Sequence, residues 1–240
     1  MSLSYSNIEW LRNPDGTKGR VWNPVTGCEN WRNGVCGGGG SEFNCWAKRM
    51  AERFRGPGGF LPQYWPERLT QPLGPIKPQR IGVCFSGDLF GDWVSHDLQE
   101  AVMQVVRTQS RHTFLFLTKC PWNLPKWNPW PDNAWVGASV TNWETAQLSN
   151  AALLGVSNNV VKFLSIEPLL GQIEGDCWMV GIDWLILGAA TAPYRPPEKA
   201  WVEEIILACQ RAGIPYFLKN NLRPLMGSNL RQEWPEVVLP

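Results

Sequence analysis

Three cysteines stand close together in the first fifth of the chain. Cys28 and Cys36 are separated by seven residues, and Cys36 and Cys45 by eight. Thiolates bind soft metals well, and a structural zinc site generally takes four protein ligands. Three thiolates without an obvious fourth ligand suit an iron-sulfur cluster in which one iron keeps an open position. We therefore interpret Cys28, Cys36 and Cys45 as ligands of such a cluster.

Two plainer interpretations of these cysteines stay open at this point. They could be buried thiols without chemistry, although the adjoining CGGGGS offers little apolar surface to bury them against. They could also hold zinc, with Cys84, Cys120 or His96 as the fourth ligand. The bound metal separates the three interpretations, because it would be iron with inorganic sulfide, zinc, or none.

Charged side chains directly follow several apolar runs. Asp88 comes after RIGVCFSG, Lys119 after HTFLFLT and Glu167 after VVKFLSI. A charge beside a buried run is costly unless it has a partner. In a β/α barrel the carboxyl ends of all strands meet on the face that carries the active site. We therefore expect these three charged groups to face one site.

The elements that would position these residues alternate along the chain. Apolar runs that read as strands lie at 20–27, 80–88, 112–119, 134–142, 160–171, 183–191 and 214–221. Helical stretches lie between them: one begins after Ser95 as N-cap, one ends at Gly155, and one runs from Pro197 to Gly213. Alternation of this kind over 240 residues predicts a parallel α/β fold with about seven strands, either a barrel or an open sheet.

Composition narrows the class of protein. The chain is 44% apolar without a run long enough to span a membrane, so we expect one domain over 1–240 with a sizeable core. The N-terminus shows no secretory signal, and seven cysteines without one indicate a reducing, cytoplasmic setting. A net charge of +1 does not indicate a polyanionic partner, although a local basic groove is compatible with it.

The sequence resembles the phage-associated three-cysteine-motif proteins, which are distant relatives of radical SAM enzymes. The resemblance rests on fragments that occur in order over most of the chain: IEW, WNPVTGC, NCWAKRMAERF, PERLTQPL, SGDLFGDWV, FLFLTK, WVGASVTN, FLSIEPLLG, DWLILGA and PYFLKNN. It implies a radical SAM-type partial (β/α) barrel with six to seven parallel strands. It also implies a [4Fe-4S] cluster on the three cysteines, with S-adenosylmethionine on the unique iron. The spacing departs from the common C-x3-C-x2-C, because GGGGSEFN stands between the second and third cysteines.

The resemblance assigns roles to further residues. The turn of Ser86, Gly87 and Asp88 would receive the methionine ammonium of the cofactor, with Asp88 as the charged partner. Ser139 and Asn142 would contact its ribose or carboxylate. Trp46 would pack beside the cluster or the adenine, or simply against the core. Lys119 and Glu167 would face the substrate, and the alternative for Glu167 is an ion pair with a lysine of the barrel.

The implied activity is cleavage of S-adenosylmethionine to a 5'-deoxyadenosyl radical that abstracts hydrogen from a substrate, with an external one-electron reductant. The phage association points to a nucleobase in DNA, hypermodified or not, or to a nucleotide, inside the host cytoplasm. The prolines of 56–80 predict a long loop. The four tryptophans of 120–135, with Lys126, Arg223 and Arg231, could grip a strand, or the rings could close the barrel face.

Two other functions remain as alternatives. Lys119 could form a Schiff base if its pKa were depressed by burial, which would make the protein an aldolase-like lyase. This leaves the three cysteines without a role. A zinc-stapled nucleic-acid-binding module without catalysis would use the cysteines and the tryptophans, but it does not explain the acidic and amide residues at the strand ends.

Overall fold

The computed structural model describes residues 2–30, 36, 45–191 and 193–236. Its main sheet holds eight strands: β1 (Ser4–Tyr5), β2 (Arg20–Trp22), β5 (Arg80–Val83), β6 (Thr113–Thr118), β7 (Ala134–Val140), β8 (Val161–Ile166), β9 (Trp184–Leu187) and β12 (Tyr216–Leu218). Two small antiparallel pairs stand apart: β3 (Val25–Thr26) with β4 (Gln63–Tyr64), and β10 (Ala190–Thr191) with β11 (Tyr194–Arg195).

The helices are α1 (Trp46–Arg55), α2 (His96–Thr108), α3 (Trp143–Leu154), α4 (Lys199–Ala212) and α5 (Arg223–Met226). Short 3-10 turns are η1 (Glu9–Leu11), η3 (Pro66–Arg68), η4 (Gln71–Leu73), η5 (Pro121–Trp127), η6 (Cys177–Met179) and η7 (Asn220–Leu222). Among the described residues, no helix has the length and apolar character needed to cross a membrane.

The main sheet is a curved, incomplete barrel. Its strands follow the order β1-β2-β5-β6-β7-β8-β9-β12, and all pairings from β2 to β12 are parallel. β1 adds an antiparallel edge to β2, and within the described residues no ladder joins β12 back to β1 or β2. The partial barrel with about seven parallel strands is therefore confirmed, and one side of it lacks a strand.

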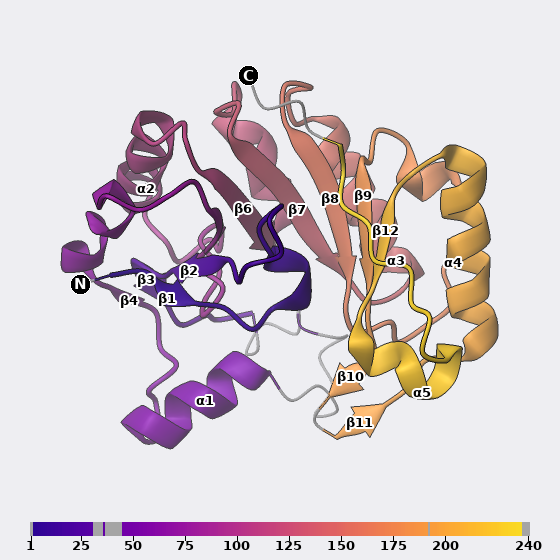
Figure 1. Cartoon of the computed structure of the whole chain (residues 1–240). Coiled ribbons are helices and arrows are strands. Elements are labelled where there is room, and N and C mark those ends of the chain that lie inside the picture. The colour runs from indigo at the N-terminus through magenta and orange to yellow at the C-terminus, as the bar shows by residue number, and fades with distance from the viewer. Residues whose placement is uncertain (1, 31–35, 37–44, 192, 237–240) are drawn as a thin grey trace.

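The helix ends follow the chemistry of the sequence. Ser95 caps α2 by accepting a hydrogen bond from the backbone of Leu98, and Asn142 caps α3 through a reciprocal box with Thr145. Gly213 ends α4 in the left-handed region, at φ 67°, where a glycine avoids the strain that a Cβ would bring. These helices cover the outer face of the sheet, and α2 and α4 flank it in Figure 1.

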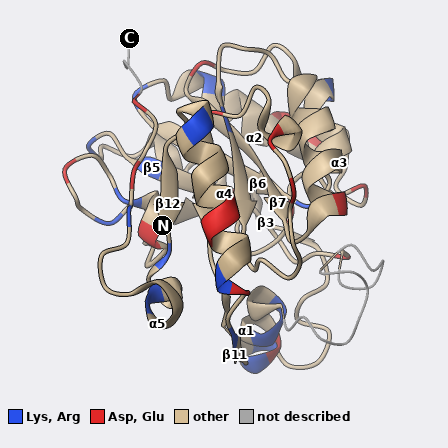
Figure 2. Cartoon of the chain, turned by 90° about the vertical axis from the view of Figure 1, so that its right-hand side faces the viewer, with Lys and Arg blue, Asp and Glu red and all other residues tan. Residues whose placement is uncertain are grey.

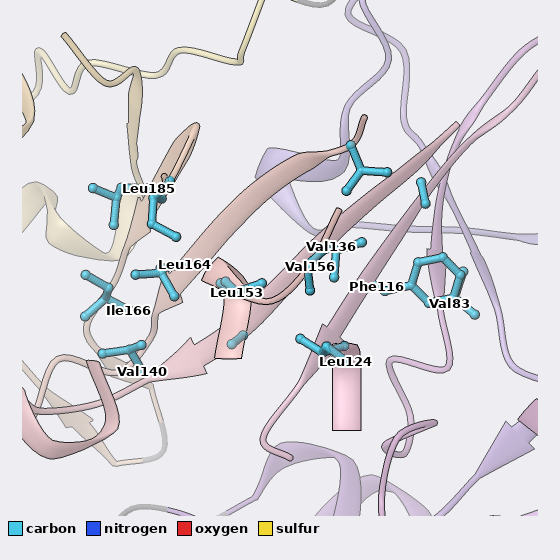
Figure 3. Packing of buried hydrophobic residues seen from close by; sticks show 14 of the residues in the cluster. Val83, Phe116, Leu124, Val136, Val140, Leu153, Val156, Leu164, Ile166 and Leu185 are labelled. Carbon is cyan, nitrogen blue, oxygen red and sulfur yellow. The ribbon is translucent and has the colours of Figure 1, made fainter. Parts of the chain in front are cut away.

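Side chains alternate between the two faces of each strand. On β7, Val136 and Val140 point outward into the large cluster beneath the helices, where they meet Leu164 and Ile166 of β8 (Figure 3). Residues of the opposite parity point into the barrel, and Trp135 is one of them. This period of two explains why a continuous apolar run forms a strand that is buried on both faces.

Aromatic rings fill the inside of the barrel. Trp135, Phe163, Trp184 and Phe217 come from four strands, and Trp10 from η1 packs onto them. The N-terminal segment that carries Trp10 crosses in front of the sheet in Figure 1, on the side where the barrel lacks a strand. The rings form a second apolar cluster inside the barrel.

The tryptophans of 120–135 mostly serve the core. Trp127, Trp130 and Trp135 are only 7%, 2% and 3% exposed, whereas Trp122 is 48% exposed. The hypothesis that this run forms a stacking platform is therefore wrong for three of its four rings. The 56–80 segment is, as expected, a loop without a long helix, interrupted by β4 and two 3-10 turns.

Candidate functional site

A cavity of about 250 Å³ opens at the carboxyl ends of the strands. Its wall includes the three cysteines of the proposed cluster, Cys28, Cys36 and Cys45, together with Lys119 and Glu167. α1 and the β10–β11 hairpin lie at this end of the sheet (Figure 1). Strand ends that are far apart in the sequence thus meet at one site, as the barrel topology requires.

Two glycines bring Cys28 to this cavity. A parallel bridge joins Gly27 to Gly87, and the backbone N–H of Gly27 donates to the carbonyl of Ser86 at 3.0 Å. A Cβ on Gly87 would lie 2.5 Å from the carbonyl oxygen of Gly27. Gly27 itself has φ 82°, in the left-handed region. The close approach of the two segments places Cys28 beside Asp88.

Asp88 is buried and has four hydrogen-bond donors around its carboxylate. Oδ1 accepts from the Thr118 hydroxyl at 2.6 Å and from the backbone N–H of Phe90 at 3.2 Å. Oδ2 accepts from the side-chain amide of Asn30 and from the backbone N–H of Lys119, both at 2.9 Å. Burial raises the pKa of this carboxyl group, although the bonds from Thr118, Lys119 and Phe90 oppose the shift. The protein itself thus supplies four donors to the carboxylate that the resemblance assigns to the cofactor ammonium.

Asn30 extends the Asp88 network to the cysteine loop. Its side-chain oxygen lies 3.4 Å from Cys120 Sγ, and its backbone N–H lies 3.4 Å from Cys28 Sγ. Sequence reasoning missed Asn30, because the partners of its side chain, Asp88 and Cys120, lie 58 and 90 residues away. Hydrogen bonds of Asn30 thus link the Asp88 carboxylate to Cys28 and Cys120.

Cys45 and Trp46 lie where the chain enters α1. Cys45 is the N-cap residue of this helix. Trp46 lines the cavity and is 51% exposed, so it is available to a bound molecule and not only a core contact. The helix buries little of its own apolar surface, because Ala47 is the single buried residue within Trp46–Arg55.

The three thiols are free, and the pKa values of two of them are raised, which favours the neutral thiol. Burial, with the charge of Asp88 next in importance, raises the pKa of Cys28, and burial also raises the pKa of Cys36. Within the described residues, no group of three or more His, Cys, Asp and Glu side chains is arranged to hold a metal ion. The structure therefore places the thiols on one wall without showing a metal site.

The fourth zinc ligands considered from the sequence do not reach this wall. His96 stacks on Trp127 with ring centroids 5.1 Å apart, and neither it nor Cys84 or Cys120 lines the cavity. Cys120 is instead buried next to Asn30. The structure thus gives no support to a four-ligand zinc staple built on these residues.

Lys119 projects into the cavity, with Nζ 3.4 Å from the Ser139 hydroxyl. Burial alone would lower its pKa, but Cys36, Asp88 and the other two cysteines favour the ammonium whenever they are ionised, and the pKa of Lys119 is raised above its ordinary value. A Schiff-base lysine needs the opposite shift, because the neutral amine is the nucleophile. The electrostatics of the site therefore disfavour the aldolase-like alternative.

Glu167 forms the ion pair that was considered as its alternative role. One carboxylate oxygen accepts from the indole N–H of Trp10 and from the Ser165 hydroxyl, each at 2.8 Å. The other oxygen accepts from the ammonium of Lys219, which follows β12. Glu167 thus joins β8, the N-terminal segment and the last strand. The cavity is lined by all four side chains of this cluster, namely Trp10, Ser165, Glu167 and Lys219.

Most, but not all, of the expected site residues meet here. Gly87 and Ser139 line the cavity with the residues above, whereas Ser86 and Asn142 do not. The Asn142 side chain is occupied as the cap of α3. Sequence reasoning missed Trp10 as a site residue, because it lies in η1 and not at the end of a strand. Ser165 was recognised as a polar residue at a strand end, two residues before Glu167, but was not assigned a role.

Comparison with solved structures supports the fold. The chain is similar to a spore photoproduct lyase complexed with dinucleoside spore photoproduct, with a TM-score of 0.52 over 94% of this chain and 78% of that one. The sequence identity is 10%, so the likeness concerns the fold alone. Together with the strand order, it confirms the radical SAM-type partial barrel that the resemblance implied.

Comparison with sequences gives a family without an assigned activity. No curated protein matches the chain. A family model matches residues 5–223, nearly the whole chain, and its description reads "Protein of unknown function (DUF5131)". The chain therefore belongs to the DUF5131 family.

Proposed function

We propose that this protein is a radical SAM enzyme in which Cys28, Cys36 and Cys45 hold a [4Fe-4S] cluster and S-adenosylmethionine binds beside them. The observation that carries the proposal is the presence of these three free thiols on one cavity wall, at the carboxyl ends of a partial barrel of the matching type. The bound cluster and cofactor would supply a 5'-deoxyadenosyl radical for hydrogen abstraction.

The residues present suit this cofactor by donor type and place. Among the described lining residues there is no fourth cysteine and no histidine, and three thiols match a cluster with one open iron better than they match zinc. The raised pKa values of Cys28 and Cys36 mean that loading would displace protons from these thiols.

The remaining cavity residues would position the two small molecules. Asp88 and Asn30 would hold the Cys28 loop against β5 and β6. Ser139, next to Lys119, offers a hydroxyl to the ribose or carboxylate of the cofactor. The Glu167–Lys219 pair lies on the β8–β12 side of the cavity, which we assign to the substrate.

We further propose that the substrate is a nucleobase, carried by DNA or by a nucleotide. Support comes from the lyase of similar fold, which was solved with a dinucleoside photoproduct, and from the phage-family resemblance of the sequence. The tryptophans of 120–135 no longer support a polymer, because most of them are buried.

Anaerobic reconstitution with iron and sulfide tests the enzyme class. The loaded protein, reduced with dithionite and given S-adenosylmethionine, should form 5'-deoxyadenosine. Alanine at Cys28, Cys36 or Cys45 should abolish both the charge-transfer absorbance and the product. Cys177→Ala is the matched control, because Cys177 is exposed and lies outside the cavity. A wild-type protein that binds zinc only, or that takes up no metal, would overturn the proposal.

The substrate class is tested with the same preparation. Phage genomic DNA, unmodified DNA and free nucleotides are incubated separately and digested to nucleosides for mass spectrometry. The expected result is a changed nucleoside in one of these samples, together with release of 5'-deoxyadenosine from the cofactor that depends on the substrate. Cofactor cleavage without any response to nucleic acid would leave the enzyme class standing and overturn the nucleobase assignment.

A further inference from the structure

A second concave site lies on the side where the barrel lacks a strand. It is a groove of about 590 Å³ between the turn after η1 and the segment that follows β12. Three arginines line it, Arg12, Arg80 and Arg223, with one carboxylate, that of Glu9. In Figure 2, basic segments of the chain lie around β5, β12 and α5. The groove is therefore positive in a protein whose net charge is only +1.

Arg80 forms the inner wall of this groove. Its guanidinium lies 4.9 Å from the ring centre of Trp135 and 5.6 Å from that of Trp234, and it donates to the carbonyl of Arg12 at 2.7 Å. Burial lowers the pKa of Arg80 to about 10, so the protein holds this cation at an energetic cost. Two rings and a carbonyl fix the direction of the group but do not neutralise its charge.

The other charges in the groove leave an excess of positive charge. Within the described residues, none of the three guanidinium groups forms an ion pair with a carboxylate. The Glu9 carboxylate accepts a hydrogen bond from the backbone N–H of Asn220 at 2.8 Å. Arg12 and Arg223 are exposed, so their guanidinium forks remain available for a bidentate anion.

One segment of backbone separates this groove from the cavity. Ile8 and Trp10 line the cavity, while their neighbours Glu9 and Arg12 line the groove. On the opposite side, Lys219 lines the cavity and the next residue, Asn220, lines the groove. A ligand with repeating anionic groups could therefore lie in the groove while a neighbouring part of the same molecule enters the cavity.

We propose that the groove of Arg12, Arg80 and Arg223 binds the phosphodiester backbone of a nucleic-acid strand. Part of the argument, the entry of a base into the cavity, rests on the proposed function. The anion chemistry of the groove does not, because it follows from three unpaired guanidinium groups in one concavity. A strand is favoured over a single phosphate because three guanidinium groups line the groove, and a strand presents a repeated series of phosphates to them.

Binding of a fluorescent single-stranded oligonucleotide to the full chain, without added iron or cofactor, tests this proposal. The double variant Arg12→Gln/Arg223→Gln should weaken binding about tenfold or more at moderate salt, and lower the slope of log K against log salt by about 1.4, or ~0.7 per lost phosphate contact. The matched control is Arg107→Gln/Arg211→Gln, which removes the same charge from two surface ion pairs elsewhere. This control should bind within about twofold of wild type.

Several results would overturn the proposal. These are absence of strand binding by the wild type, equal loss in the control variant, or no loss in the groove variant. Stronger binding of polyglutamate would indicate an acidic protein partner instead. Tight binding of a nucleoside triphosphate with no binding of the strand would assign the groove to free nucleotides. Because the assay needs no cluster, failure of the radical SAM chemistry and failure of the groove are observed separately.

Discussion

Replacement of Asp88 by asparagine separates two roles for this residue. The sequence resemblance predicts that Asp88→Asn weakens S-adenosylmethionine binding and leaves the cluster intact. The structure predicts a different result, because the carboxylate oxygens already accept four hydrogen bonds and one donor, Asn30, contacts Cys28. The variant should lose cluster content first, and cofactor affinity only as a consequence.

The magnitude follows from the four contacts. In the least costly arrangement, the new amide NH2 takes the place of Oδ1, where the Thr118 hydroxyl can turn to accept, and the amide oxygen takes the place of Oδ2. The Phe90 N–H then has no partner, which costs ~1–3 kcal/mol, and the bonds to Asn30 and Lys119 each lose charge assistance worth ~0.5–1.5 kcal/mol. Relief of the buried charge offsets part of this, since burial raises the pKa of Asp88. We expect a net loss of ~1–3 kcal/mol.

Thermal unfolding and iron analysis measure this loss. For a chain of this size, ~1–3 kcal/mol corresponds to a decrease in Tm of ~2–12 °C. Iron and sulfide per chain after reconstitution should fall below half of the wild-type value. Thr118→Val removes a donor to Oδ1, whereas Asn30 binds the other carboxylate oxygen, so this variant should lower Tm without the loss of iron. An Asp88→Asn protein with wild-type Tm and iron but weaker cofactor binding would refute the positioning role.

Three further predictions concern single features of the fold. Gly87→Ala should lower Tm and cluster content, because its Cβ would lie 2.5 Å from an opposing carbonyl oxygen; Gly74→Ala, whose nearest neighbour is at 3.7 Å, should not. Burial, with the charge of an adjacent arginine, lowers the pKa of His112 to about 4. The contribution of His112 to stability should therefore be complete above pH 6.5 and fall by up to ~3 kcal/mol as the pH drops through 4. Urea titrations of His112→Gln should lack this loss. Lys219→Met should cost ~1–3 kcal/mol, and a double-mutant cycle with Glu167→Gln should show that the two losses are not additive; additive losses would contradict the ion pair.

The sequence predicted those features that depend on neighbouring residues. Apolar runs identified the strands, and Ser95, Gly155 and Gly213 were recognised as helix ends because capping is a local interaction. Convergence of the charged strand ends on one cavity followed from parallel topology alone. The cysteines reached the same cavity because the chain returns to the end of β5 at the Gly27–Gly87 bridge.

The partners of the charged groups could not be predicted from the sequence. Asp88 was interpreted as a free carboxylate because its donors lie far away in sequence or belong to the backbone, which has no sequence signal. The burial of Trp127 and Trp130 could not be predicted for a related reason. A tryptophan in a proline-rich connection looks the same in the sequence whether its ring lies over the core or in solvent, and only the path of η5 decides between them.

The missing side of the barrel has a further consequence for the site. Segments near the two ends of the described chain cover it together, since the Trp234 indole donates to the carbonyl of Trp10 and the Trp10 indole donates to Glu167, each at 2.8 Å. Glu167 is also held by Lys219 at the end of the last strand. Hydrogen bonds through one carboxylate thus connect the segment before β2 with β8 and β12, and within the described residues no strand ladder joins that segment to either strand. Any displacement of Trp10 would therefore change the cavity and the arginine-lined groove at the same time.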